Sequence, residues 1–220
     1  MPGTSKPRLI LIAVLLVTGA VYLPACGYQF VYDDHGQILD NQYALTWSWL
    51  PHYFTSHVWS SKQLAAPVYY RPLFLVWLLL NYQLFGVNPA WWHLTTVLAH
   101  VLATFLVYRL AVKLFDDPWP AGIAALLFGL HPVHIESVTW VSGVSEPLVA
   151  VFLLSALIFY LRSRDPADAR ARTWLPVSLA LAGTALLAKE TALILPLLIF
   201  GHAAFFPSGK ATLSPRIRML

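Results

Sequence analysis

Two neighbouring aspartates, Asp33 and Asp34, follow the first long apolar stretch of the chain. Only ten of the 220 residues are Asp or Glu, so paired carboxylates at this position need an explanation. Like charges on neighbours disfavour each other unless a proton, a cation or a basic group compensates them. One carboxylate could be a general base toward a hydroxyl while the other holds a divalent cation or orients the first. The alternative is a turn or cap, because Asp-Asp-His-Gly is also a common turn sequence.

A second cluster, His131-Pro-Val-His134-Ile-Glu136, follows a later apolar segment. Two imidazoles and a carboxylate this close can share a metal ion, with Asp34 as a further candidate ligand. Carboxylates favour Mg²⁺ or Mn²⁺, and histidines favour Zn²⁺. The spacing differs from the helical zinc-protease motif, so an ordinary loop whose histidines bond backbone groups remains the alternative.

Two basic residues are candidates for binding phosphate. Lys189 and Glu190 interrupt two apolar segments, and charges near the bilayer indicate function by default. Lys189 could bind a phosphate as a point charge, unless it only pairs with Glu190 in a tight turn. Arg71 is the second candidate, and its alternative is snorkelling to the surface. His100, inside an apolar segment, is interpreted as a packing residue.

The composition places these residues in a membrane protein. Hydrophobic residues make up 58% of the chain, charged residues 11%, and the mean hydropathy is +0.64. Soluble domains carry about 25% charged residues. The net charge of +4 does not indicate nucleic acid, because the basic residues are distributed by membrane side. The single cysteine, Cys26, excludes an internal disulfide and any multi-cysteine metal site.

Hydropathy predicts an all-α, polytopic membrane protein with about six spans. The third span is short, so we expect it to extend past Leu130 or to end in a buried, bent stretch. A further run, Val68–Phe85, contains Arg71, Pro72, Asn81 and Gln83, which favours a helix in the interface. The predicted spans are Leu9–Gly27, Trp91–Phe115, Trp119–Leu130, Pro147–Leu161, Trp174–Ala188 and Ala192–Phe206.

Basic residues decide the orientation. With a cytoplasmic amino terminus and no crossing at Val68–Phe85, eleven Lys and Arg lie inside and three lie outside. The inner set is Lys6, Arg8, Arg109, Lys113, Arg162, Arg164, Arg170, Arg172, Lys210, Arg216 and Arg218, and the outer set is Lys62, Arg71 and Lys189. This split follows the positive-inside rule, and a crossing at Val68–Phe85 would reverse it.

The orientation brings the candidate site residues to one face. Asp116-Asp117 falls inside and indicates a solvated turn. The residues that fall outside are Asp33, Asp34, His35, His131, His134, Glu136, Glu146, Lys189 and Glu190. The aromatic-rich loop within residues 28–86 should fold onto the membrane surface, with short helices around Trp47–Phe54. The first segment also resembles a signal peptide ending at Cys26, but we expect it to be retained.

Six short motifs in one order resemble a known family. They are Tyr32-Asp33-Asp34, Tyr70-Arg71-Pro72-Leu73, Asn81-Tyr82-x-Leu84-Phe85-Gly86, His93-Leu94, His131-Pro132-x-His134-x-Glu136 and Ala188-Lys189-Glu190. Together, over about residues 9–206, they resemble the membrane module of the transmembrane and tetratricopeptide-repeat O-mannosyltransferases, within the GT-C fold of membrane glycosyltransferases. The chain then divides into the outer loop, residues 28–86, and a bundle, residues 91–206, with no repeat domain.

The resemblance implies a glycosyltransferase that moves mannose or another hexose from a polyprenyl-phosphate donor to a hydroxyl on a protein or glycan. Asp33 and Asp34 would be catalytic, Lys189 and Arg71 would hold the donor phosphate, and Asp34, His131, His134 and Glu136 would hold a divalent metal. Family members are longer, so we expect an amino-terminal portion. We expect a bacterial inner membrane, with the amino terminus cytoplasmic and the active face periplasmic.

Two other function classes remain open at this stage. A transporter or lipid-carrier translocase would use the acidic residues as an ion relay, with ionisable groups along the depth of the helices. A structural or assembly subunit would need no chemistry. The crowding of ionisable groups at the outer ends favours the transferase.

Overall fold

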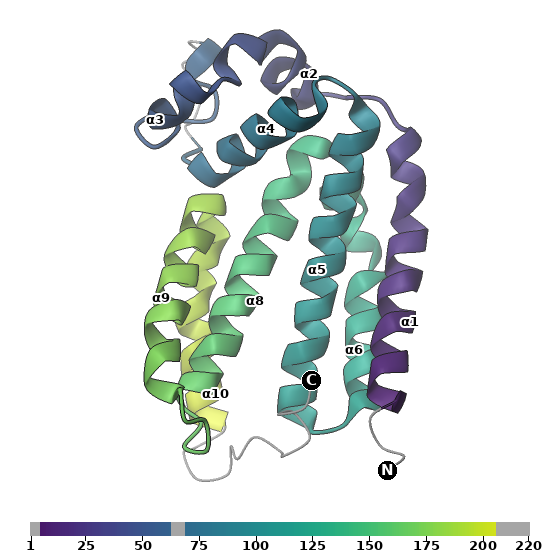
Figure 1. Ribbon diagram of the computed structural model, residues 1–220, viewed down its shortest axis with the longest axis vertical. Helices are drawn as coiled ribbons and strands as arrows, with labels where there is room; N and C mark the ends of the chain where they lie inside the picture. Colours follow the sequence, from purple (N-terminus) through teal and green to yellow (C-terminus); the bar gives the residue numbers. More distant parts are fainter. Residues whose placement is uncertain (1–4, 63–68, 206–220) are drawn as a thin grey trace.

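In the computed structural model, which describes residues 5–62 and 69–205, the regular structure is helical. Four apolar helices run along the long axis of the molecule (Figure 1). Each is long and apolar enough to cross a membrane, which confirms the prediction of a polytopic membrane protein. They are α1 (Ser5–Tyr22), extended by η1 (Leu23–Gly27), α5 (Pro89–Phe115), α8 (Ser145–Ser163), preceded by η6 (Val141–Val144), and α9 (Ala171–Ala188).

A fifth candidate span is broken. Helix α6 (Pro118–Gly129) is followed by η5 (Pro132–His134) and α7 (Ile135–Thr139), and the two parts are bent by 45°. Pro132 explains the break, because the residue before a proline avoids helical dihedral angles and proline lacks an N–H to donate. The bend expected after Leu130 is therefore confirmed, whereas most residues of the bent stretch are exposed in this chain rather than buried.

The predicted sixth span is shorter than a crossing requires. Helix α10 (Leu195–Phe205) has 11 residues, preceded by η7 (Glu190–Ile194). Eleven helical residues extend about 16 Å, against about 30 Å of hydrocarbon. The described chain therefore has four or five candidate spans rather than six. The predicted end of this segment, Phe206, lies outside the described residues.

A cap of short helices covers one end of the bundle (Figure 1). We call it the outer cap, and its last helix, α4, lies across the ends of the long helices (Figure 1). This arrangement agrees with the predicted interfacial helix, whose first predicted residue, Val68, lies outside the described residues. The outer cap consists of α2 (Asp33–Gln37), η2 (Leu39–Ala44), η3 (Trp47–Trp49), α3 (Leu50–Tyr53), η4 (Ser60–Lys62) and α4 (Pro72–Phe85).

The polar residues of α4 bond it to the cap and to α5. Asn81 accepts a 2.7 Å hydrogen bond from Thr95 of α5. The Gln83 amide donates to the carbonyl of Leu45 in the cap. The chain then turns at Gly86, whose φ of +57° is a conformation that side chains disfavour. The polar side of α4 therefore fastens the cap to α5.

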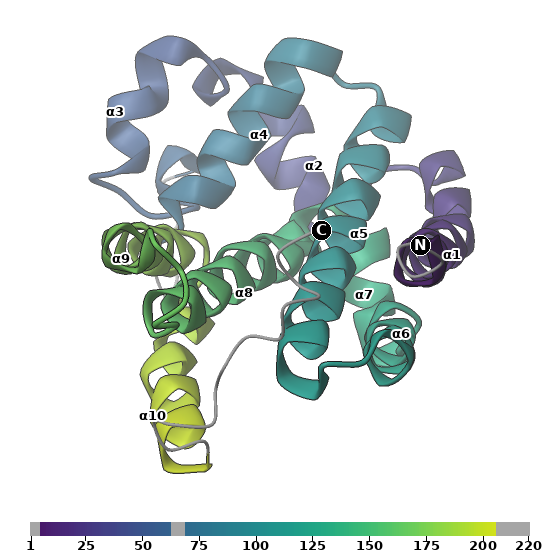
Figure 2. The same cartoon turned by 60° about the horizontal axis from the view of Figure 1, so that its bottom comes forward.

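The long helices form two groups that meet where α5 packs against α8. One group contains α1, α5 and α6, and the other contains α8, α9 and α10 (Figure 2). In the first group small residues allow close packing, since Ala121 and Ala125 of α6 are fully buried. Small residues at helix contacts are typical of membrane bundles.

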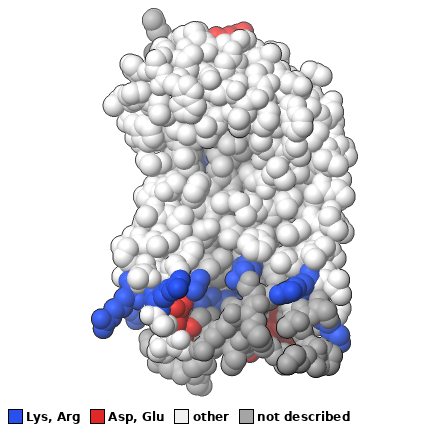
Figure 3. All heavy atoms as spheres, viewed as in Figure 1, with Lys and Arg blue, Asp and Glu red and all other residues white. Residues whose placement is uncertain are grey.

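Charge is distributed between the two ends as the sequence predicts. Lys and Arg gather at the end opposite the outer cap, and little charge shows on the face between (Figure 3). Arg71 and Lys189 belong to the capped end, where both line the same cavity. Lys210, Arg216 and Arg218 lie outside the described residues.

Candidate functional site

A cavity of about 830 Å³ lies under the outer cap. Apolar residues of α5, α6 and α8, such as Ala103, Phe128 and Val149, form part of its wall. Its charged or imidazole-bearing lining residues are Asp33, Arg71, His100, His134, Glu136, Glu146, Lys189 and Glu190. A cavity in which apolar walls meet convergent polar groups is the usual form of a small-molecule site, and this one is richly charged.

The structure gives the two aspartates different surroundings. Asp34 is fully buried, and Oδ1 accepts hydrogen bonds from the backbone N–H and the hydroxyl of Ser142, at 2.9 and 2.5 Å. Oδ2 accepts from the backbone N–H of Val31 at 3.0 Å. Both oxygens are therefore engaged, and Asp34 fastens the start of the cap to η6 between α7 and α8.

Asp33 differs because it is partly exposed and lines the cavity. Burial raises the pKa of its carboxyl group, and the negative charge of Asp34 raises the pKa further. A carboxylate with a raised pKa is a stronger base once ionised, which suits proton transfer from a hydroxyl. Of the two predicted catalytic residues, Asp33 is the one that lines the cavity.

The two candidate phosphate-binding residues form ion pairs across the cavity. Lys189 pairs with Glu146 at the start of α8. Arg71 donates two hydrogen bonds to Glu190, at 3.1 Å from Nε and 2.5 Å from Nη2. Lys189 and Glu190 thus each bond a distant residue, in place of the pairing between neighbours in a tight turn.

The histidines near the bend have separate roles. The Nδ1 atom of His131 accepts the backbone N–H of Val133 at 3.1 Å and so caps η5. His134 lines the cavity, and its ring centroid lies 5.1 Å from that of His100. His100 contacts the Gly129 carbonyl oxygen at 3.0 Å through Nε2, as a packing histidine should.

The predicted metal set does not converge. Among the described residues, no group of three or more His, Cys, Asp or Glu side chains is placed to hold a metal ion. Asp34 is bonded by Ser142 and Val31, and His131 by its own turn. The residues present therefore do not fit a metal centre built from Asp34, His131, His134 and Glu136, and we derive no step through a metal.

Two cavity residues did not stand out in the sequence. Ser142 holds Asp34, and Trp140 lines the wall. Glu146 and Glu190, which the sequence already placed on the outer face, balance the two basic groups. Ser142 and Trp140 carry no charge and no motif, so only their contacts reveal them.

Comparison with known proteins identifies the family. Residues 70–220 match the family described as dolichyl-phosphate-mannose-protein mannosyltransferase. The chain belongs to this family. Human protein O-mannosyl-transferase TMTC3 is 35% identical over 75% of this chain and 18% of its own length. Drosophila Tmtc2 is 34% identical over 79% of this chain and 19% of its own length, and mouse TMTC1 is 31% identical over 83% and 20%.

The chain therefore spans about a fifth of the length of these relatives. No solved structure is significantly similar to it. These relatives come from animals, and they give no support to a bacterial inner membrane.

Proposed function

We propose that this chain is the membrane module of a GT-C type glycosyltransferase, which moves mannose or another hexose from a polyprenyl-phosphate donor to a hydroxyl of a protein. The family's description supplies the donor class and the protein acceptor. The main observation behind the proposal is the cavity at the capped end, where basic residues are few. Asp33 lies on its wall, and Arg71 and Lys189 belong to the same lining. The active face is then on the side away from the cytoplasm.

In this proposal Asp33 is the base. Its ionised carboxylate takes the proton of the acceptor hydroxyl while the acceptor oxygen bonds to the anomeric carbon of the sugar. The bond from that carbon to the phosphate oxygen breaks, and its electron pair leaves with the lipid phosphate. Displacement from the opposite face inverts the anomeric configuration. Asp34 follows Asp33 in the same short helix and is bonded to Ser142, so Asp34 positions Asp33.

Lys189 and Arg71 stabilise the departing phosphate. Both are held by carboxylates that are about half exposed, Glu146 at 47% and Glu190 at 55%. Because the carboxylates are open to solvent, these pairs are weaker than fully buried ones, and an incoming phosphate can replace the carboxylates. Positive groups directed at the charge that develops on the leaving group are a main source of rate enhancement.

The test compares two aspartates of the outer cap. Asp33→Asn should reduce sugar transfer by at least 100-fold, the lower range for a lost general base. Asp40→Asn is the matched control, because Asp40 is exposed in the same cap and does not line the cavity. Transfer of labelled mannose from a polyprenyl-phosphate donor to protein, in membranes containing each variant, gives the readout. Normal transfer by Asp33→Asn would contradict the proposal.

A further inference from the structure

The residue before Asp33 is held in an unfavourable backbone conformation. Tyr32 has φ of 50° and ψ of −120°, and the Asp34 N–H donates to the Val31 carbonyl at 3.0 Å. These features define a type II′ turn with Tyr32 at the position where glycine is preferred. Non-glycine residues persist in such conformations only where the surroundings hold them, and they cluster at functional sites.

The surroundings that hold Tyr32 in this turn are on both sides of it. Asp34 accepts the Val31 N–H, and the His35 ring contacts the Phe30 carbonyl at 3.0 Å. The turn is therefore closed by two side chains that follow Tyr32 and bond backbone groups that precede it, as well as by its own backbone bond. A tyrosine at a glycine position calls for a reason in its side chain.

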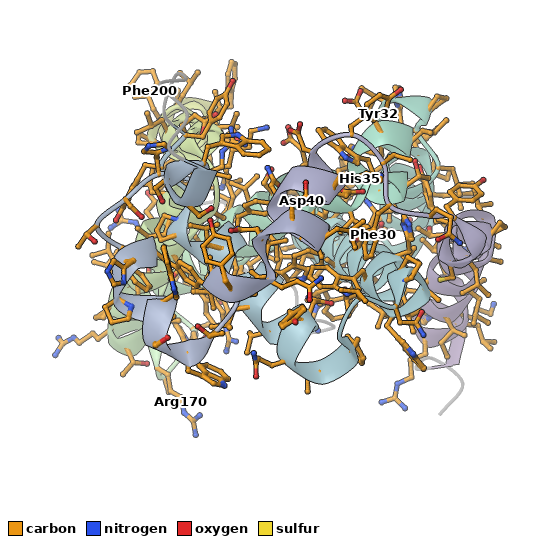
Figure 4. All side chains as sticks on the ribbon, turned by 90° about the horizontal axis from the view of Figure 1, so that it is seen from above. Phe30, Tyr32, His35, Asp40, Arg170 and Phe200 are labelled. Atoms are coloured by element: carbon orange, nitrogen blue, oxygen red, sulfur yellow. The ribbon has the colours of Figure 1, made fainter. Side chains whose placement is uncertain are left out.

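The Tyr32 side chain is not needed for packing, since it is 86% exposed. In the view from above, Tyr32 lies at the edge of the molecule, and Phe30 lies farther in (Figure 4). The one ring contact of Tyr32 among the described residues is with Trp140, edge to face, with centroids 6.5 Å apart. An exposed aromatic ring next to a candidate base is available to contact a substrate.

Trp140 brings an unused hydrogen-bond donor to the same place. It lines the cavity, as Asp33 does, and its indole N–H is shielded from solvent. Within the described part of the chain, this N–H has no acceptor. Buried donors are satisfied in most native structures, and an exception calls for an explanation.

We propose that Tyr32 and Trp140 form the subsite for the acceptor, an extended polypeptide segment that carries the reacting hydroxyl. The Tyr32 ring packs on the segment beside that hydroxyl, and the Trp140 indole N–H turns into the cavity and donates to a backbone carbonyl of the segment. This inference rests on the proposed function and adds the residues that select its acceptor.

The chemistry of the pair favours a polypeptide over a glycan. A single N–H donor matches a peptide carbonyl, whereas sugar hydroxyls are recognised by sets of groups that both donate and accept. Tyrosine contributes a large contact area at low conformational cost, as it does in antibody binding sites. Both residues act by positioning the acceptor, and proton transfer remains with Asp33.

The test separates acceptor binding from the reaction. Tyr32→Gly should raise the KM for an acceptor peptide at least tenfold while the KM for the polyprenyl-phosphate sugar stays within twofold. The same variant should keep or raise the melting temperature, since glycine suits the turn. Trp140→Phe keeps a ring and removes the donor, and it should raise the acceptor KM about three- to tenfold.

Trp47→Phe is the matched control, because Trp47 is 57% exposed in the same cap and does not line the cavity. Unchanged acceptor KM in Tyr32→Gly and Trp140→Phe would overturn the inference, and so would equal rises in donor and acceptor KM. A rise seen with a glycan acceptor but not with a peptide would also overturn it. The proposed function fails separately, if Asp33→Asn retains transfer.

Discussion

At the scale of single residues, the adjacent aspartates divide two tasks between them. Asp33 lines the cavity, and Asp34 holds the backbone that carries it. The negative charge of Asp34 adds to burial in raising the pKa of Asp33. The pair therefore makes one residue an anchor and leaves the other with a raised pKa.

The pKa of Asp33 predicts how activity depends on pH. A base must be ionised, so transfer should fall as the pH drops through the pKa of Asp33. Because burial and Asp34 raise this pKa, the acid limb should lie above the value near 3.9 of a free aspartate. The position of this acid limb is measured from the pH profile of kcat/KM at saturating donor. An acid limb at or below the free value would contradict the assignment of Asp33.

The two aspartates should also differ in their effect on stability. Asp34→Asn turns an amide toward N–H donors, which costs about 1–3 kcal/mol for each donor left without an acceptor. Asp33→Asn should be neutral or stabilising at neutral pH. Because the pKa of Asp33 is raised in the folded state, the protonated carboxyl group favours folding. The contribution of Asp33 to stability is therefore present at low pH and is lost as the pH rises through this pKa.

Thermal unfolding in detergent, followed for both variants and for Ser142→Ala, checks this contrast. Ser142→Ala removes one of the bonds to Asp34 and keeps the backbone bond, so its loss of stability should be the smaller of the two. Equal stability of Asp33→Asn and Asp34→Asn would remove the argument for an anchor.

At the scale of elements, the close contact between α1, α5 and α6 should be sensitive to volume. A Cβ added at Gly129 would lie 2.4 Å from Thr18 Oγ1 and 3.1 Å from Thr104 Cγ2. Overpacking of this kind costs about 1–3 kcal/mol. Gly129→Ala should therefore lower the melting temperature measured in detergent.

The matched control is Gly183→Ala in α9, where an added Cβ meets nothing within 4 Å. Alanine is favoured over glycine inside a helix by about 0.5–1 kcal/mol, so this variant should be as stable as the parent or more stable. Equal melting temperatures of the two variants would contradict the close packing of α6 against α1 and α5.

At the scale of the whole molecule, the two ends should face opposite sides of a membrane. With Cys26 replaced by alanine, a cysteine at Asp40 in the outer cap and one at Asp168, between α8 and α9, should react with a membrane-impermeant thiol reagent from opposite sides. Labelling of both from one side would contradict the topology and the shared outer face. Opposite labelling would also disfavour the reading of Val68–Phe85 as a span.

The sequence predicted the class of fold well and the number of spans less well. Apolar length identifies α1, α5, α8 and α9 as spans because each segment alone satisfies its backbone groups in lipid. The same measure overstates α10, since its described helix has 11 residues and a crossing takes about 20. The bend after Leu130 was predictable because Pro132 acts on its immediate neighbour.

Hydropathy and charge along the chain were enough to predict a polytopic membrane protein whose basic residues gather at one end. These properties act segment by segment against the bilayer. The packing of the helices was needed to show that Asp34 bonds Ser142, that Arg71 pairs with Glu190, and that Tyr32 meets Trp140. Those contacts join residues 108, 119 and 108 positions apart, and their geometry depends on how the helices pack.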